Sequence, residues 1–162
     1  METLILGLGN PILSDDGVGF RVAQALEDRL NQPNVTVMET SVAGLDFLEL
    51  MVGYDRAIII DSIQTKEGKV GQIYKFKPDA FDATRHASTP HDVNFATALE
   101  LGNRLGLALP QQIVIFAIEV ENVTTYSEEC TPKVRDAIPV CVKRVIEEIT
   151  SGDSKPVPKM SR

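Results

Sequence analysis

The chain has 162 residues, of which 43% are hydrophobic and 24% are charged, a composition that excludes an intrinsically disordered protein and suits one domain. Its 16 basic and 23 acidic residues give a net charge of −7. This balance argues against nucleic acid as a partner, because such binding depends on neutralising phosphates. No apolar run approaches the roughly 20 residues of a membrane span, and residues 1–4 lack the basic segment of a signal peptide.

The composition changes only near the carboxyl end. Residues 151–162 are polar, contain two prolines, and carry three basic groups and one acid, which are features of a disordered tail. We therefore expect one domain over residues 1–150, with a net charge of −9, that acts as a monomer. The two cysteines form neither a disulfide framework nor a CxxC site, so we expect a cytoplasmic protein.

The first half of the chain alternates strand and helix patterns. An apolar run at residues 4–8 predicts a buried strand, and apolar residues at helical spacing predict a helix over 17–30. A weaker β-branched run at 35–39 predicts a strand nearer an edge, and residues 44–53 repeat the helical spacing. Residues 57–60 are apolar without polar alternation, as expected for a strand that is covered on both faces of a parallel sheet.

The second half continues this alternation. Residues 72–76 follow a turn and predict a strand that pairs with the strand before it, and residues 92–105 predict a helix. Residues 113–118 predict a further buried strand. The last helix is expected to start at about Thr131 as its cap, and Pro139 should kink this helix or delay its start.

Strands that alternate with helices predict an α/β fold with three layers, about five mainly parallel strands and helices on both faces of the sheet. In such sheets, ligands bind beyond the carboxyl ends of the strands, near the point where the strand order reverses. The segments after the first and third strands, residues 9–19 and 61–62, are therefore the first candidates for a site, with residues 89–92 before a helix.

The loop after the first strand does not fit a nucleotide site. Gly7 and Gly9 match the start of a dinucleotide fingerprint, but Ile12 stands where the third glycine should be. Asp15 and Asp16 would also repel a pyrophosphate. The glycines instead allow a tight turn and a close approach of the backbone.

Three side chains remain as candidates for chemistry. Ser14 or Asp15 is expected to cap the following helix, which leaves Asp16 without a structural task. Asp61 follows a buried strand, where a charge needs a partner, and His91 lies in a loop before a helix. Two carboxylates and one imidazole that converge at one end of a sheet suit a divalent transition metal with positions open for water or substrate.

Other catalytic templates fit poorly. The sequence has no Gly-x-Ser-x-Gly elbow, and its two histidines, His86 and His91, lie five residues apart, which excludes HExxH. Cys130 and Cys141 could offer a thiolate nucleophile. A structural thiol is the commoner case, so the carboxylates and His91 are preferred.

Three segments together resemble a known family. Residues 7–19 have the pattern GxGN-x-(L/I)-x-x-D-(D/E)-G-x-G, Asp61-Ser62 follows a strand, and Pro90-His91 follows later. In order and spacing, over about residues 3–149, they resemble the endopeptidases that mature nickel–iron hydrogenases. The resemblance implies a phosphorylase/hydrolase-like α/β fold. It also implies removal of a short carboxy-terminal peptide from the nickel-loaded precursor of the hydrogenase large subunit.

The resemblance further implies the roles of individual residues. Asp16, Asp61 and His91 would contact the metal, above all nickel presented by the substrate, with no nucleotide cofactor. If either carboxylate accepts a proton, Asp16 is the expected one. Two mechanisms stay open: recognition of the substrate's nickel, or a bound metal that lowers the pKa of an attacking water. Asn10 would either orient a substrate carbonyl or stabilise its own loop, and the loop role is favoured.

Two other classes of protein stay open. A non-catalytic nickel-binding maturation factor would use the same three residues and leave its partner at full length. Residues 6–11 also resemble the opening of peptidyl-tRNA hydrolase, and residues 84–86 match its Thr-Arg-His. In that family the tripeptide follows the opening closely, whereas here it lies far along the chain, and the acidic body disfavours tRNA.

Overall fold

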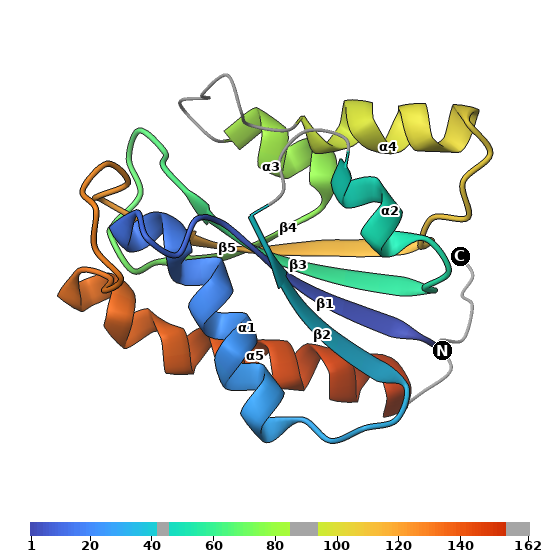
Figure 1. Ribbon diagram of the computed structural model, residues 1–162, viewed down its shortest axis with the longest axis horizontal. Helices are drawn as coiled ribbons and strands as arrows, with labels where there is room; N and C mark the ends of the chain where they lie inside the picture. Colours follow the sequence, from blue (N-terminus) through green and yellow to red (C-terminus); the bar gives the residue numbers. More distant parts are fainter. Residues whose placement is uncertain (42–45, 85–93, 155–162) are drawn as a thin grey trace.

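The computed structural model describes residues 1–41, 46–84 and 94–154, and it shows one sheet with helices on both faces (Figure 1). The strands are β1 (Thr3–Leu8), β2 (Val35–Thr40), β3 (Arg56–Ile63), β4 (Ile73–Phe76) and β5 (Gln112–Glu119). Their order across the sheet is β2-β1-β3-β5-β4. β1 is parallel to β2 and β3, β3 is parallel to β5, and β4 is antiparallel to β5. The predicted three-layer α/β fold with mainly parallel strands is confirmed, as is the edge position of β2.

The helices form the two outer layers of the fold (Figure 1). One layer contains α1 (Val18–Arg29) and α5 (Pro132–Ser154), and the other contains α2 (Phe47–Met51), α3 (Pro78–Thr84) and α4 (Phe95–Arg104). A short 3₁₀ turn, η1 (Ser14–Gly17), leads into α1. None of the described helices combines the length and the apolar character of a membrane span.

The central strands bury side chains on both of their faces. Ile58 and Ile60 belong to the apolar core under α1 and α5, whereas Ala57 and Ile59 belong to the core under α2, α3 and α4. All four are fully buried, and each isoleucine contributes about 2 kcal/mol by its removal from water. Because both faces of β3 need apolar side chains, its sequence reads as a continuous run without alternation.

The predicted partner of β4 was wrong. β4 pairs with β5, in the antiparallel register Ile73↔Ile118, and not with the strand that precedes it in the chain. The sheet order explains the difference. β3 already has β1 on one edge and β5 on the other, so only the outer edge of β5 is open to β4.

α5 departs from the prediction at Pro139 and at its carboxyl end. The helix starts at Pro132 and contains Pro139 in its interior, so the expected delay of its start was wrong. Pro139 is exposed, and water can therefore reach the carbonyl group that loses its hydrogen bond. The helix continues to Ser154, inside the segment predicted as a tail, and ends before Pro156, whose ring disfavours a helical residue ahead of it.

Candidate functional site

The direction of the strand order reverses between β1 and β3. The chain passes from β1 to β2 on one side and then crosses to β3 on the other side. Residues 9–17 follow β1, and Asp61 lies near the carboxyl end of β3. Asp61 is inside the strand and not directly after it, because pairing with β5 continues to Ile63. The two predicted segments thus meet at the switch point of the sheet, where ligands of such folds bind.

Two glycines bring the start of α1 against the sheet. A Cβ on Gly19 would overlap the carbonyl oxygens of Ile60 and Leu8, and a Cβ on Gly7 would overlap the carbonyl oxygen of Gly19. The backbone of α1 therefore packs directly on β1 and β3, closer than a residue with a side chain permits. As a result η1, which carries both aspartates of the loop, contacts β3.

The carboxylate of Asp16 accepts hydrogen bonds from the loop after β1 and from β3. Its Oδ2 accepts from the backbone N–H of Asn10 at 2.9 Å, and its Oδ1 accepts from the hydroxyl of Ser62 at 3.4 Å. The side chain is half-buried. Donors on two different segments fix the orientation of the carboxylate.

Ser62 connects the two candidate carboxylates. Its backbone N–H donates to Oδ1 of Asp61 at 2.8 Å, while its hydroxyl donates to Asp16. The structure therefore brings Asp16 and Asp61 together around one serine. Sequence analysis did not single out Ser62, although its position directly after Asp61 at the switch point was a usable signal.

Asn10 shapes the loop that carries Asp16. Its Oδ1 accepts a hydrogen bond from the backbone N–H of Ile12 at 3.1 Å, and its carbonyl oxygen accepts from the N–H of Leu13 at 3.1 Å. This is the turn that an asparagine side chain stabilises by mimicking backbone. Asn10 thus has the loop role, and its contact with substrate stays a prediction.

Asp15 has entirely different surroundings from its neighbour. It is fully buried, and its carboxylate accepts from the backbone N–H groups of Glu121, Asn122 and Thr131 at 3.2, 3.0 and 2.7 Å. The hydroxyl of Thr131 donates to the same carboxylate. Asp15 therefore fixes the segment 121–131, which connects β5 to α5, against the loop after β1.

The prediction that Ser14 or Asp15 caps the first helix was wrong. In the described part of the chain, neither η1 nor α1 has a side-chain hydrogen bond at its N-cap. The hydroxyl of Ser14 instead donates to the carbonyl of Glu129 at 3.1 Å. Both side chains are drawn toward the segment 121–131, so they are not available to the helix end.

His91 lies outside the described residues, and its place beside the two aspartates stays a prediction. The described helices on either side of that segment are held together by Asp82 of α3. Its carboxylate accepts from the backbone N–H groups of Phe95 and Ala96 of α4, at 3.0 and 2.8 Å.

Within residues 1–41, 46–84 and 94–154, no group of three His, Cys, Asp or Glu is arranged to hold a metal ion. The described site therefore offers a pair of carboxylates, which supply hard oxygen ligands for a divalent cation.

Both cysteines have raised thiol pKa values. Burial raises the pKa of Cys141 to about 12. The pKa of Cys130 is raised mainly by burial and further by the negative charge of Asp15, while Arg21 opposes the shift. Both thiols are therefore protonated at neutral pH, and a thiolate nucleophile is disfavoured.

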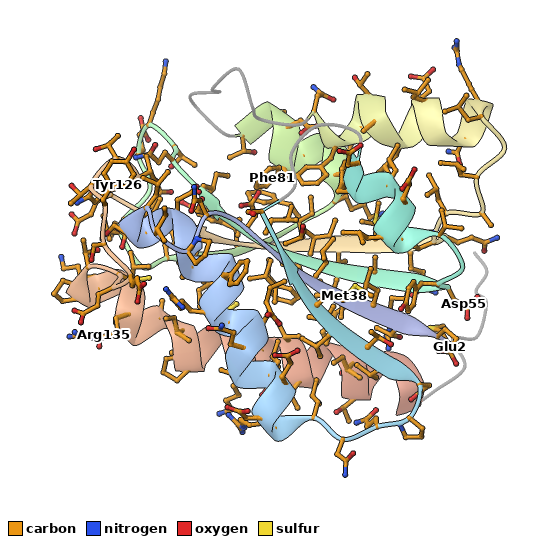
Figure 2. The ribbon with its side chains drawn as sticks, viewed as in Figure 1. Glu2, Met38, Asp55, Phe81, Tyr126 and Arg135 are labelled. Carbon is orange, nitrogen blue, oxygen red and sulfur yellow. The ribbon has the colours of Figure 1, made fainter. Side chains whose placement is uncertain are left out.

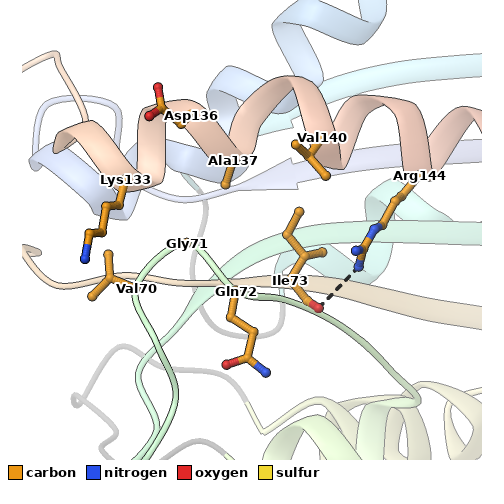
Figure 3. A pocket seen from close by; sticks show the side chains of 9 residues that line it. All are labelled: Val70, Gly71, Gln72, Ile73, Lys133, Asp136, Ala137, Val140 and Arg144. Atoms are coloured by element: carbon orange, nitrogen blue, oxygen red, sulfur yellow. Dashed lines mark hydrogen bonds between the residues drawn. The ribbon is translucent and has the colours of Figure 1, made fainter.

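A cavity of about 600 Å³ lies between α5 and residues 70–73 (Figure 3). Its walls include Val140 and Arg144 of α5, and Nη1 of Arg144 donates to the carbonyl of Ile73 at 3.4 Å. Neither site aspartate lines it. The carboxylate pair is thus distinct from this cavity.

Comparison with known proteins identifies relatives of the whole chain. Residues 20–148 match the family described as hydrogenase maturation protease. The hydrogenase 2 maturation protease of Escherichia coli K12 is 26% identical over 161 residues, which cover 98% of this chain and 97% of that protein. A putative hydrogenase maturation protease of Methanocaldococcus jannaschii is 27% identical over 158 residues, covering 91% of this chain and 94% of its own. The solved structure of the hydrogenase maturating endopeptidase HybD from E. coli superimposes with a TM-score of 0.82, at 25% identity and 94% coverage of both chains.

Proposed function

This chain belongs to the hydrogenase maturation protease family, and we propose that it removes a short carboxy-terminal peptide from the nickel-loaded precursor of a nickel–iron hydrogenase large subunit. Its relatives are proteases and endopeptidases, and the chain is accordingly a peptidase. The same finding favours a cutting enzyme over a maturation factor that only binds nickel.

One observation supports the proposal most strongly. Asp16 and Asp61 come from different segments of the chain, yet Ser62 hydrogen-bonds to both of them. They lie at the point of the sheet where the strand order reverses, which is where this kind of fold binds ligands. Carboxylate oxygens at this edge of the sheet are ligands that a divalent metal ion accepts, so a metal ion on the substrate is a fitting occupant.

We assign the recognition of nickel to Asp16, Asp61 and His91. Nickel is here part of the substrate, and two carboxylate oxygens and one imidazole nitrogen are ligands that a divalent transition metal accepts. The donors from Asn10 and Ser62 hold Asp16 in a fixed direction, as supporting residues do around metal ligands. Such a site would bind a nickel-loaded precursor more tightly than one without nickel, because the carboxylates attract the metal cation.

For the hydrolytic step, Asp16 is the proposed proton acceptor. Water attacks the carbonyl carbon of the scissile peptide bond and loses a proton to the Asp16 carboxylate. The C–N bond then breaks, and the proton passes to the leaving amine of the peptide. The half-buried position of Asp16 suits this task, since the group is accessible to water and yet held in place.

The proposal predicts a specific pattern of inactive variants. Asp16→Asn, Asp61→Asn and His91→Ala should each abolish processing of a nickel-loaded precursor while the variants stay folded. Asp136→Asn is the matched control, because Asp136 is an exposed carboxylate on α5 outside the site, and it should process at the wild-type rate. Wild-type processing by either site-aspartate variant would contradict the assignment.

We also place this reaction in the cytoplasm. Cys130 and Cys141 are both free thiols, which suits a reducing compartment.

A further inference from the structure

Two exposed apolar side chains lie at the end of the sheet that carries the carboxylate pair. Ile12 is 47% exposed and Tyr126 is 81% exposed, the largest exposed fraction among the large apolar side chains that the structure describes. Figure 2 shows Tyr126 at the end of the molecule where β5 ends, opposite the end that carries Glu2 and Asp55. Singly scattered exposed apolar residues are ordinary on a protein surface, whereas neighbouring ones beside a site mark a place where another molecule is contacted.

Backbone pairing brings these two residues together. Leu13 and Ser127 form a parallel β-bridge, in which the N–H of Ser127 donates to the carbonyl of Ile12 and the N–H of Ser14 donates to the carbonyl of Ser127, both at 2.9 Å. In this register Ile12 lies opposite Tyr126. Ile12 is also part of the same short loop as Asp16, so the pair is fixed to the candidate catalytic carboxylate.

The segment that presents Tyr126 is held in place along its length. Asp15 binds its two ends, through the backbone of Glu121, Asn122 and Thr131. Between these points, Oδ1 of Asn122 accepts from the N–H groups of Thr124 and Thr125, at 3.2 and 3.1 Å. A large aromatic side chain on such an ordered segment loses little conformational freedom when it binds.

Arg21 provides a further connection between the two segments. Its Nη2 donates to the carbonyl of Pro11 at 3.0 Å and to the carbonyl of Glu128 at 2.9 Å. One guanidinium of α1 therefore joins the residue before Ile12 to a residue close to Tyr126. We call Ile12 and Tyr126 together the Ile12–Tyr126 surface.

The segment that carries Tyr126 is itself acidic, with the guanidinium of Arg21 hydrogen-bonded to its Glu128 carbonyl. Residues 121–131 contain three glutamates and no lysine or arginine. Glu121, Glu128 and Glu129 are all exposed. A partner segment that contacts Tyr126 would therefore be stabilised by basic side chains next to its apolar one.

We propose that the Ile12–Tyr126 surface docks the precursor beside the carboxylate pair, and that the segment seated there carries an apolar side chain flanked by lysine or arginine. This inference rests on the proposed function, since it takes the precursor as the occupant. Contact with a surface tied to the Asp16 loop places the bound chain in a fixed direction relative to Asp16, so the surface acts on binding and positioning and not on the chemical step.

Two measurements on the full-length protein test this surface: the kinetics of processing of a nickel-loaded precursor, and the equilibrium binding of the same precursor. Tyr126→Ser should raise KM and Kd about tenfold, the scale of losing one aromatic contact at an interface, with kcat within about twofold. Tyr126→Phe retains the ring and should behave as wild type. The double variant Glu128→Gln/Glu129→Gln should raise KM and weaken its dependence on salt, because fewer charges then attract the basic side chains.

Leu105→Ser is the matched control. Leu105 is 66% exposed and lies between α4 and the start of β5, at the opposite end of the sheet, so its replacement should leave both constants unchanged. If wild type processes the precursor and Tyr126→Ser does so with unchanged KM and Kd, the docking surface is refuted while the proposed function stands. If wild type does not process the precursor, the proposed function fails, and the binding constants alone then decide whether the surface exists.

Discussion

The adjacent carboxylates of Asp15 and Asp16 have different surroundings, because the two side chains point to different segments of the chain. Asp15 is enclosed by donors of the segment 121–131, whereas Asp16 faces the ends of β1 and β3. Asp15 therefore contributes to stability, and the site role of Asp16 stays a prediction. Sequence analysis expected one of the two to be structural but assigned Asp15 to the wrong partner, a helix N-terminus.

Replacement of each aspartate by alanine should separate these tasks. Asp15→Ala leaves three backbone N–H groups without their acceptor in a buried position, and it should lower the free energy of unfolding by about 3 kcal/mol. Asp16→Ala, the matched variant, should lower it by less than about 1 kcal/mol, because its half-buried partners can bind water. Urea unfolding of both variants measures the difference. Equal losses would contradict the distinction.

Glu39, at the end of β2, should make stability depend on pH. Its Oε2 is buried and has no hydrogen-bond partner among the described residues. Burial raises the pKa of Glu39 above its ordinary value of 4.5, and the neighbouring carboxyl of Glu27 raises it further. The folded state therefore holds this proton more tightly than the unfolded chain, so stability is lost as the pH rises from 4.5 through the raised pKa.

Glu39→Gln should remove this loss. At pH 7 the variant should unfold at a higher temperature than wild type, and below pH 4.5 the two should coincide, because Glu39 is then neutral in both states. Glu49→Gln, at an exposed position of α2, is the control and should have no effect at either pH. A Glu39→Gln protein less stable than wild type at pH 7 would show that the carboxylate has a stabilising partner.

At the scale of elements, α1 can pack on the sheet only because Gly19 has no side chain. A Cβ at Gly19 would overlap backbone oxygens of β1 and β3, which cannot move without breaking the sheet. Gly19→Ala should therefore destabilise the protein by about 3 kcal/mol or more and displace η1 from β3. We expect loss of processing to accompany this displacement.

Gly102→Ala is the comparison for this variant. Gly102 also lies in a helix, α4, but its added Cβ would come too close to one atom, the terminal Cδ1 of Leu109 at 2.7 Å, and would touch Leu48 and Leu107 at ordinary contact distances. A leucine side chain can turn aside. The gain in helix propensity offsets the small repacking, so thermal unfolding of Gly102→Ala should lie close to that of wild type. Similar losses in both variants would show that close packing of α1 on the sheet is not the reason for Gly19.

The sequence was sufficient for elements whose pattern follows from burial alone. β1, β3 and β5 are recognisable as apolar runs because both of their faces lie in cores. Strand pairing that depends on the tertiary structure could not be predicted from the pattern of apolar residues. β4 pairs with β5 because β3 has no edge left, and α3 is too short to show a helical period, although Pro78 at its first position was a signal.

The candidate site, too, could be predicted only in part. Its location could be predicted, because the switch point depends only on the order of elements. The connection through Ser62 could not, since it requires the register of β3 next to the loop after β1. His91 belongs to the predicted set and lies outside the described residues, so its place beside the two aspartates stays a prediction.

For the whole molecule, three features act together: a sheet whose strand order reverses beside β1, two carboxylates at that point, and an exposed apolar pair on the adjoining loops. The family of proteases to which the chain belongs gives these features a common purpose. On the proposed function, the precursor would dock on the Ile12–Tyr126 surface, its nickel would meet the two carboxylates, and the bond to be cut would lie beside Asp16. Nickel dependence is the central claim of this account.

The most direct test is the intact mass of a hydrogenase large-subunit precursor before and after incubation with this protein, with nickel present or omitted from the precursor. The account predicts loss of one discrete carboxy-terminal peptide from the nickel-loaded precursor and no change without nickel. Equal shortening of both precursors would contradict recognition of nickel. An unchanged mass in the presence of nickel would contradict cleavage itself.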